Sequence, residues 1–139
     1  MNSPAERYLA LGRKAGLLLT GEDVCRAAAG QGRVRLMLLA ADASPNAQKR
    51  AHDAMEGRRA PLRTLPWNKE ELSALLGRRG CSMVCFTDLA RAEHFAKALA
   101  EGLPEWQKTA ELLSQREDKA RRRKGVKRRK PDPIENRRM

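Results

Sequence analysis

The chain has 139 residues, of which 41% are hydrophobic, so one domain with a modest core and a tail is expected. Its net charge of +12 favours a polyanionic partner. No apolar run approaches the roughly 20 residues of a membrane span, and residues 1–13 lack the apolar region of a signal peptide, so we expect a cytoplasmic protein with no membrane partner.

Capping residues and apolar runs define the elements of the first thirty residues. A capping box at residues 3–6, with proline at the first helical position, predicts a helix from there to Lys14. Residues 17–19 are typical of a short strand. Thr20 is predicted to be the N-cap of a helix over residues 21–30.

The middle of the chain alternates between strands and helices. The apolar run in residues 33–41 lacks polar alternation, which is typical of a strand covered on both faces. Ser44 and the proline after it predict a helix that ends near Gly57. Residues 62–65 lie between two prolines and are predicted to form an edge strand. Asn68 begins a second capping box, which predicts a helix to about residue 76.

Residues 81–87 are predicted to form the last strand, followed by a helix that Asp88 caps. The alternation of strands and helices predicts an α/β domain over residues 1–102. Residues 103–115 are predicted to form a further helix that docks on this domain.

The C-terminal segment carries most of the charge. Residues 116–139 contain twelve Lys or Arg and four Asp or Glu, a net charge of +8, which leaves +4 for residues 1–115. With so few apolar residues this tail is expected to be disordered when free and to neutralise RNA phosphates without reading sequence. The alternatives are a solubilising tail and, in a eukaryote, a nuclear-localisation signal. The expected nonspecific contacts are Arg121, Arg122, Arg123, Lys124, Lys127, Arg128, Arg129 and Lys130.

No motif indicates catalysis, a metal site or a cofactor. The cysteines Cys25, Cys81 and Cys85 are odd in number and lack metal-ligand spacing, and we expect Cys81 and Cys85 to share one face of a strand as small hydrophobes. His52 and His94 are isolated on amphipathic segments. We therefore predict no enzyme, no metal and no cofactor.

Four segments, in order, resemble the superfamily of ribosomal proteins L-seven-Ae and L-thirty-e, and most closely its small bacterial YlxQ-like branch. They are RKAGLLLTGEDV, LMLLAADASPNAQKR, LSALLG and VCFTD, so the resemblance covers about Tyr8 to Leu99. It implies a three-layer α/β/α sandwich with a mixed four-stranded sheet. It also implies recognition of kink-turn or related structured RNA without catalysis.

The helix start at Gly21 is the main candidate RNA site. Its free amides suit a polar base edge, and Glu22 and Asp23 can accept hydrogen bonds from guanine. Acidic residues in a first turn also stabilise a helix whatever its function, which is the simpler interpretation.

The family pattern here is glycine, any residue, asparagine, glutamate, two residues, lysine. An ungapped alignment from Gly21 puts Asp23, Val24 and Ala27 at the three polar places. A register shifted by one puts Glu22, Asp23 and Arg26 there instead, and both registers remain open.

The resemblance places further residues on the same surface. The loop Gly77–Gly80 matches the family loop that presses on a flipped nucleotide, and here Arg78 and Arg79 offer stacking or phosphate contacts. The alternative is a solvated turn. Arg13 and Lys14 can contact phosphates or stabilise a helix C-terminus. Asp42 matches a family aspartate but is also a typical turn or capping residue.

These observations predict a monomeric, non-enzymatic protein that recognises structured RNA through Lys14, the 21–23 helix start with Arg26, Asp42 and the Arg78–Gly80 loop. Ribosomal RNA is the expected ligand, and ribosomal proteins are possible partners. The alternatives are a protein-interaction module on the same fold and nonspecific nucleic-acid binding through the tail.

Overall fold

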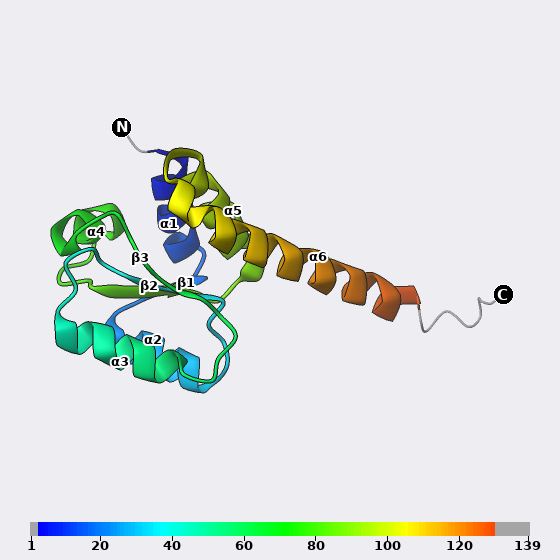
Figure 1. Cartoon of the computed structure of the whole chain (residues 1–139), viewed down its shortest axis with the longest axis horizontal. Helices are drawn as coiled ribbons and strands as arrows, with labels where there is room; N and C mark the ends of the chain where they lie inside the picture. The colour runs from blue at the N-terminus through cyan, green and yellow to red at the C-terminus, as the bar shows by residue number, and fades with distance from the viewer. Residues whose placement is uncertain (1–2, 130–139) are drawn as a thin grey trace.

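A mixed four-stranded sheet forms the centre of the molecule, in the order β1-β4-β2-β3 (Figure 1). The computed structural model describes residues 3–129, and for 124–129 the backbone alone. Strand β4 (Met83–Phe86) is antiparallel to β1 (Leu18–Thr20) and to β2 (Leu36–Leu39), whereas β2 is parallel to β3 (Leu62–Thr64). Strands β1, β2 and β3 therefore end at the same edge of the sheet.

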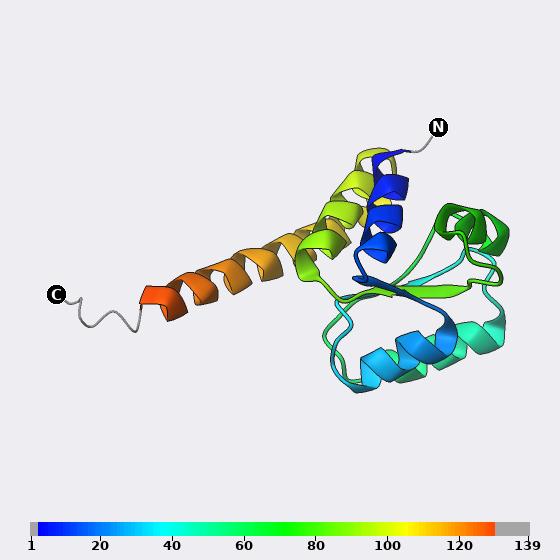
Figure 2. The same cartoon turned by 180° about the vertical axis from the view of Figure 1, so that it is seen from behind.

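Helices cover both faces of the sheet, as Figures 1 and 2 show. Helices α2 (Glu22–Gly30) and α3 (Pro45–Met55) lie on one face. Helices α1 (Pro4–Lys14), α4 (Lys69–Leu76) and α5 (Leu89–Gly102) lie on the other. The predicted α/β class with a mixed four-stranded sheet is thus confirmed.

Two apolar cores follow from the alternation of side chains along the central strands. Leu38 and Phe86 are fully buried against α1, α4 and α5. Met37 and Cys85, their neighbours in sequence, are fully buried against α2 and α3. Because successive side chains of a strand point to opposite faces, apolar residues without alternation are what a sheet covered on both sides requires.

Four of the predicted helix caps are present. The side chains of Ser3, Ser44, Asn68 and Asp88 each accept a hydrogen bond from the backbone amide three residues later. The capping boxes at Ser3 and Asn68 are complete, because the glutamate side chain in each also accepts from the cap amide. These caps satisfy amides that the first turn of a helix leaves unpaired.

The fifth predicted cap, Thr20, is wrong. Thr20 belongs to β1, where it pairs with Val84, and its hydroxyl accepts a hydrogen bond from Arg78 instead of from a helix amide. The N-cap of α2 is Gly21, whose φ of 102° and ψ of 144° turn the chain directly from strand to helix. Strand pairing outweighed the local preference of threonine for a cap.

The prediction that Cys81 and Cys85 share a strand face is also wrong. Strand β4 begins only at Met83, so the period of two does not extend back to Cys81. Cys81 is buried in the core beneath α1, α4 and α5, and Cys85 in the core beneath α2 and α3.

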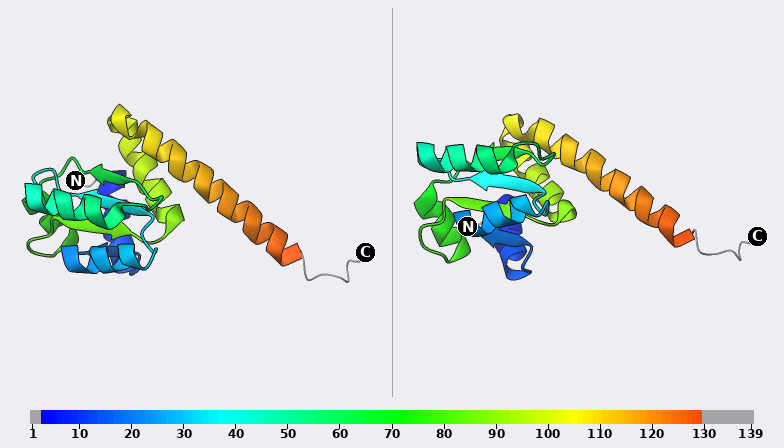
Figure 3. Two further views of the ribbon diagram at one scale, coloured as in Figure 1. Left: turned by 60° about the horizontal axis from the view of Figure 1, so that its bottom comes forward. Right: turned by 90° about the horizontal axis from the view of Figure 1, so that it is seen from below.

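The chain continues beyond α5 through a 3-10 turn, Pro104–Trp106, into helix α6 (Gln107–Arg129). Trp106, Ala110 and Leu113 are buried in the same core as α5. Figure 3 shows α6 continuing away from the sandwich as one long helix.

Helix α6 crosses the boundary that the sequence analysis placed between the docking helix and the tail. The segment 116–129, expected to be disordered, is helical, and Arg121 pairs there with Glu117 and Asp118 at helical spacing. Residues 130–139, and with them Lys130, lie outside the described part of the chain. None of the described helices is long and apolar enough to cross a membrane.

Candidate functional site

The candidate site lies at the edge where β1, β2 and β3 end. We call it the rim and define it as Gly21–Asp23, Asp42 and the loop Arg78–Gly80. In open α/β sheets, ligands bind beyond the carboxyl ends of the parallel strands. The Gly21 amide donates to the carbonyl of Met83, which fixes the beginning of α2 beside the first residue of β4.

Arg78 is held against the start of α2. Its Nη1 donates to the Thr20 carbonyl at 3.2 Å and to the Thr20 hydroxyl at 2.8 Å. Its Nη2 lies so close to Gly21 that an added Cβ there would be 3.0 Å away. Glycine at position 21 therefore allows both the positive φ and the approach of the guanidinium.

The loop that carries Arg78 is also fixed at its beginning. Gly77 ends α4 in the left-handed conformation with a φ of 64°. Arg13 reaches from α1 and donates through Nη1 to the carbonyl of Leu76. Arg13, expected to contact phosphate or to complement its own helix, thus anchors the end of another helix. Arg79 is exposed in the next position of the loop.

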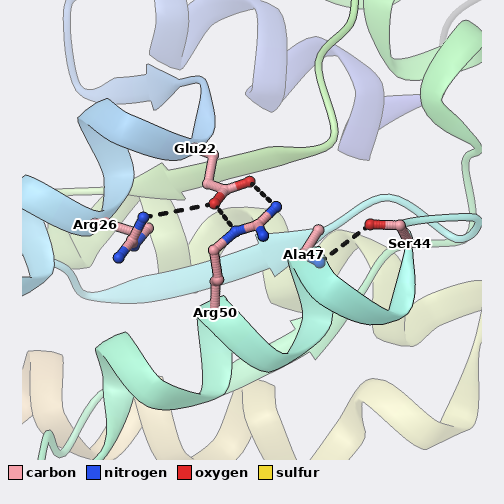
Figure 4. Close-up of polar contacts among 5 residues, drawn as sticks. All are labelled: Glu22, Arg26, Ser44, Ala47 and Arg50. Carbon is pink, nitrogen blue, oxygen red and sulfur yellow. Dashed lines mark hydrogen bonds and ion pairs between the residues drawn. The ribbon is translucent and has the colours of Figure 1, made fainter.

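The carboxylate of Glu22 interacts with two arginines (Figure 4). Arg50 on α3 donates to it through Nε and, at 3.0 Å, through Nη2. Arg26, one turn along α2, lies 3.7 Å from the same carboxylate. The hydrogen bond from Arg50 lowers the pKa of Glu22, with smaller contributions from the charges of Arg50 and Arg26. Glu22 therefore ties α2 to α3.

Because Glu22 is paired with these arginines, the RNA contacts expected at the helix start change. The shifted register gave Glu22, Asp23 and Arg26 to RNA, but two of these three residues pair with one another. Asp23 is exposed, and within the described residues it makes no ion pair. Within the described part of the chain no side chain caps α2, whose N-cap is Gly21, so its first amides remain available to a ligand beside Asp23.

The remaining predicted site residues differ in their contacts. Asp42 accepts a hydrogen bond from the amide of Lys69 at 2.7 Å and so joins the loop after β2 to the start of α4. Gly80 is exposed with a φ of 65°. Lys14 is exposed at the end of α1. The hydrogen bond of Asp42 to the first amide of α4 agrees with the interpretation of Asp42 as a capping residue.

Sequence reasoning missed three features of the rim. These are the Thr20 hydroxyl, the partner of Glu22 on α3, and Val24, whose side chain is 46% exposed within the first turn of α2. The valine between polar residues at the helix start was visible in the sequence, although its exposure was not. The two polar contacts were not, because they join residues far apart along the chain.

Cys25 and Cys81 are placed as structural groups. A hydrogen bond with Cys85 and burial raise the pKa of Cys25, and burial raises the pKa of Cys81, so both thiols stay protonated. Protonated thiols are poor nucleophiles and poor metal ligands. Among the described residues, no three His, Cys, Asp or Glu side chains are grouped to hold a metal.

The nonspecific contacts predicted for the tail fall mainly on α6. Arg122 and Arg123 are exposed, and Arg121 pairs with Glu117 at 3.3 Å and with Asp118 at 3.0 Å. Lys124, Lys127, Arg128 and Arg129 belong to the helix by their backbone.

Comparison with known proteins identifies the fold. No protein-family model and no curated protein matches the chain. Among solved structures, the chain is similar to a protein with unknown function from Bacillus halodurans C, with a TM-score of 0.64 and 24% identity. The similarity covers 70% of this chain and 97% of that one. At this identity the similarity shows a shared α/β fold and nothing of function.

Proposed function

We propose that the chain is a non-enzymatic RNA-binding protein that recognises structured RNA through the rim. The carrying observation is Arg78, which Thr20 holds against the uncapped start of α2. A guanidinium fixed in this way is planar, charged and ready to stack on a base or to contact phosphate without losing further rotamer freedom.

The rim presents both hydrogen-bond donors and a hydrogen-bond acceptor within a few residues. The first amides of α2 and Arg78 are donors, and Asp23 is an acceptor. A surface that bound only phosphate would not present a free carboxylate. The mixture suits base edges exposed in bulges and internal loops, because side chains cannot read bases in the deep groove of a regular RNA helix. RNA with a kink turn or an internal loop is therefore the proposed ligand.

The proposal extends to setting and partners. We infer that the ligand is ribosomal RNA, that the protein acts as a monomer in the cytoplasm, and that it uses no cofactor. Three buried free cysteines fit a reducing compartment. By stabilising a bent RNA, the protein would shift the RNA equilibrium by as much as its preference between the two conformations.

The test compares one RNA that contains a kink turn with a duplex of equal length and charge. Wild-type protein is expected to prefer the kink-turn RNA, and Arg78→Gln to lower that preference by roughly tenfold to a hundredfold. Arg7→Gln is the matched control, since Arg7 is exposed on α1 and has the same charge. Equal wild-type affinities for the two RNAs, both lost on deletion of residues 116–139, would leave only the charged tail as the binding agent.

Charge reversal at Asp23 separates the proposal from a protein-interaction module on the same fold. Asp23 is the acidic rim residue to use because Glu22 is engaged by Arg50. Asp23→Lys is expected to reduce the preference for the kink-turn RNA while the plain duplex binds at least as well. Unchanged RNA preference together with loss of a defined protein partner would favour the interaction module.

A further inference from the structure

A second basic surface lies at the other end of the sheet, beneath α6. There a groove of about 440 Å³ opens between α6 and the chain segments that follow α2 and α3. Figure 1 shows α6 leaving the sandwich on this side. Ala29, Val34, Met55 and Leu89 form apolar parts of its wall. Among the described side chains, six cationic ones and no acidic one line it: Arg35, Arg58, Arg59, Arg116, Lys119 and Arg123.

Helix α6 separates its charges between two faces. Arg116, Lys119 and Arg123 are spaced by three and four residues and line the groove, with the small Ala120 between them. The acidic Glu117 and Asp118 do not line the groove and pair with Arg121. The helix therefore presents cations to the groove and holds its acids elsewhere.

Within the described residues, none of the six cations takes part in an ion pair. Arg58 donates to the Gly30 carbonyl at 3.0 Å, at the end of α2. Arg59 and Arg116 both line the groove, where burial and, to a lesser extent, the positive charge of Arg59 lower the pKa of Arg116. Like charges held together without a counter-ion disfavour the folded state, and a bound anion would remove that cost.

We propose that this groove binds the phosphodiester backbone of RNA, as a second contact surface that does not read bases. Five of the six cations are arginine, whose planar fork matches phosphate oxygens in two parallel hydrogen bonds. Among the described residues that line the groove none is aromatic, so they offer no platform for base stacking.

An extended ligand fits the surroundings of the groove better than a compact acidic one. The 23 residues of α6 span about 35 Å. Beyond the groove the helical backbone continues to Arg129, through a sequence that is rich in basic residues. The choice of RNA as the polyanion rests on the function proposed for the rim, but the groove itself is independent of the rim.

The test measures binding to a plain RNA duplex, with no bulge or internal loop, over a range of salt concentrations. Arg59→Gln with Arg116→Gln is expected to reduce the slope of log affinity against log salt by roughly 1.5, because each lost phosphate contact removes about 0.7 to 0.9. Affinity at low salt should fall at least tenfold. Arg7→Gln with Lys108→Gln removes the same charge from exposed positions outside the groove and should change the slope far less.

A charge-preserving pair distinguishes binding from folding. Arg59→Lys with Arg116→Lys keeps both positive charges and should therefore keep the wild-type salt slope. If the glutamine pair lost its slope because it folds poorly, its melting temperature would be lowered as well. An unchanged slope in the glutamine pair, or an equal loss in the Arg7 and Lys108 pair, overturns the proposal. Polyglutamate that binds as tightly as an RNA duplex of equal charge would also overturn it, in favour of an acidic protein partner.

The same preparations separate this proposal from the function proposed for the rim. If wild-type protein shows no preference for kink-turn RNA but the glutamine pair has a smaller salt slope than wild type, the rim proposal fails and the groove proposal holds. If wild-type protein prefers kink-turn RNA and the glutamine pair keeps the wild-type salt slope, the groove proposal fails and the rim proposal holds.

Discussion

Substitution of Gly21 by alanine tests the joint between β1, α2 and Arg78. Position 21 has a φ of 102° and a ψ of 144°, a conformation that is nearly exclusive to glycine and costs other residues about 1 to 3 kcal/mol. The new Cβ would also lie 3.0 Å from Arg78 Nη2, tight enough that the guanidinium must shift by a few tenths of an ångström, and 3.5 Å from Cζ, an ordinary van der Waals contact. That shift would weaken the 2.8 Å hydrogen bond to Thr20, at a cost of up to about 1 kcal/mol.

We therefore expect Gly21→Ala to lose about 1 to 4 kcal/mol of unfolding free energy and to melt roughly 5 to 15 °C lower. Urea unfolding and calorimetry measure the two quantities. Gly30→Ala is the control, because a Cβ there meets nothing within 4 Å and its φ is not positive, so it should be neutral or stabilising by up to about 1 kcal/mol.

Introducing Gly21→Ala into the Arg78→Gln variant separates the cost of backbone strain from the cost of disturbing the Arg78 hydrogen bond. In that background Gly21→Ala should cost the backbone strain alone, so the two substitutions should be less than additive. Wild-type stability in Gly21→Ala, together with an unchanged preference for kink-turn RNA, would refute the argument that this backbone and this guanidinium depend on each other.

Three further predictions concern the packing of α6 and two contacts of the rim. Leu113→Ala should lose about 2 to 5 kcal/mol in urea unfolding because Leu113 is fully buried, whereas Leu11→Ala, at a side chain 52% exposed, should lose less than about 0.5 kcal/mol. A double-mutant cycle of Thr20→Val and Arg78→Gln should give a coupling of about 1 kcal/mol, and additivity would contradict the bond. Because the pKa of Glu22 is lowered in the folded state, its stabilising contribution is present above its usual pKa of 4.5 and is lost as the pH falls through the lowered value. The stability gap between wild type and Glu22→Gln should therefore shrink in acid, and a gap that does not depend on pH would contradict the Glu22 interaction.

Helix beginnings could be predicted from the sequence where their causes are local. Ser3 and Asn68 each cap a helix through atoms three residues away, so the residues needed for the prediction lie within one turn. The buried strands could also be predicted, because a sheet covered on both faces needs apolar residues without alternation. Strand ends were less accurate, since β2 begins three residues later than expected.

The rim was predictable only in outline. The resemblance to a known family brought Gly21 and the 77–80 loop to one surface, but the role of each residue depends on partners far along the chain. Thr20 and Arg78 are 58 positions apart, and Glu22 and Arg50 are 28 apart. A local preference, such as that of threonine for a cap, was overruled by contacts of this range. Asp23 is therefore the acidic residue left for a ligand, although the sequence ranked it equal to Glu22.

The division of charge between domain and tail was also altered by the fold. Arg116 belongs by sequence to the basic tail, yet α6 places it beside Arg59 in the groove. Arg58 has a structural explanation, because a cation at the end of α2 stabilises that helix and satisfies the Gly30 carbonyl. Arg59 and Arg116 have no such explanation among the described contacts, although both line the groove. They are therefore the two charges whose placement a bound polyanion explains best, and the two whose replacement tests the groove most directly.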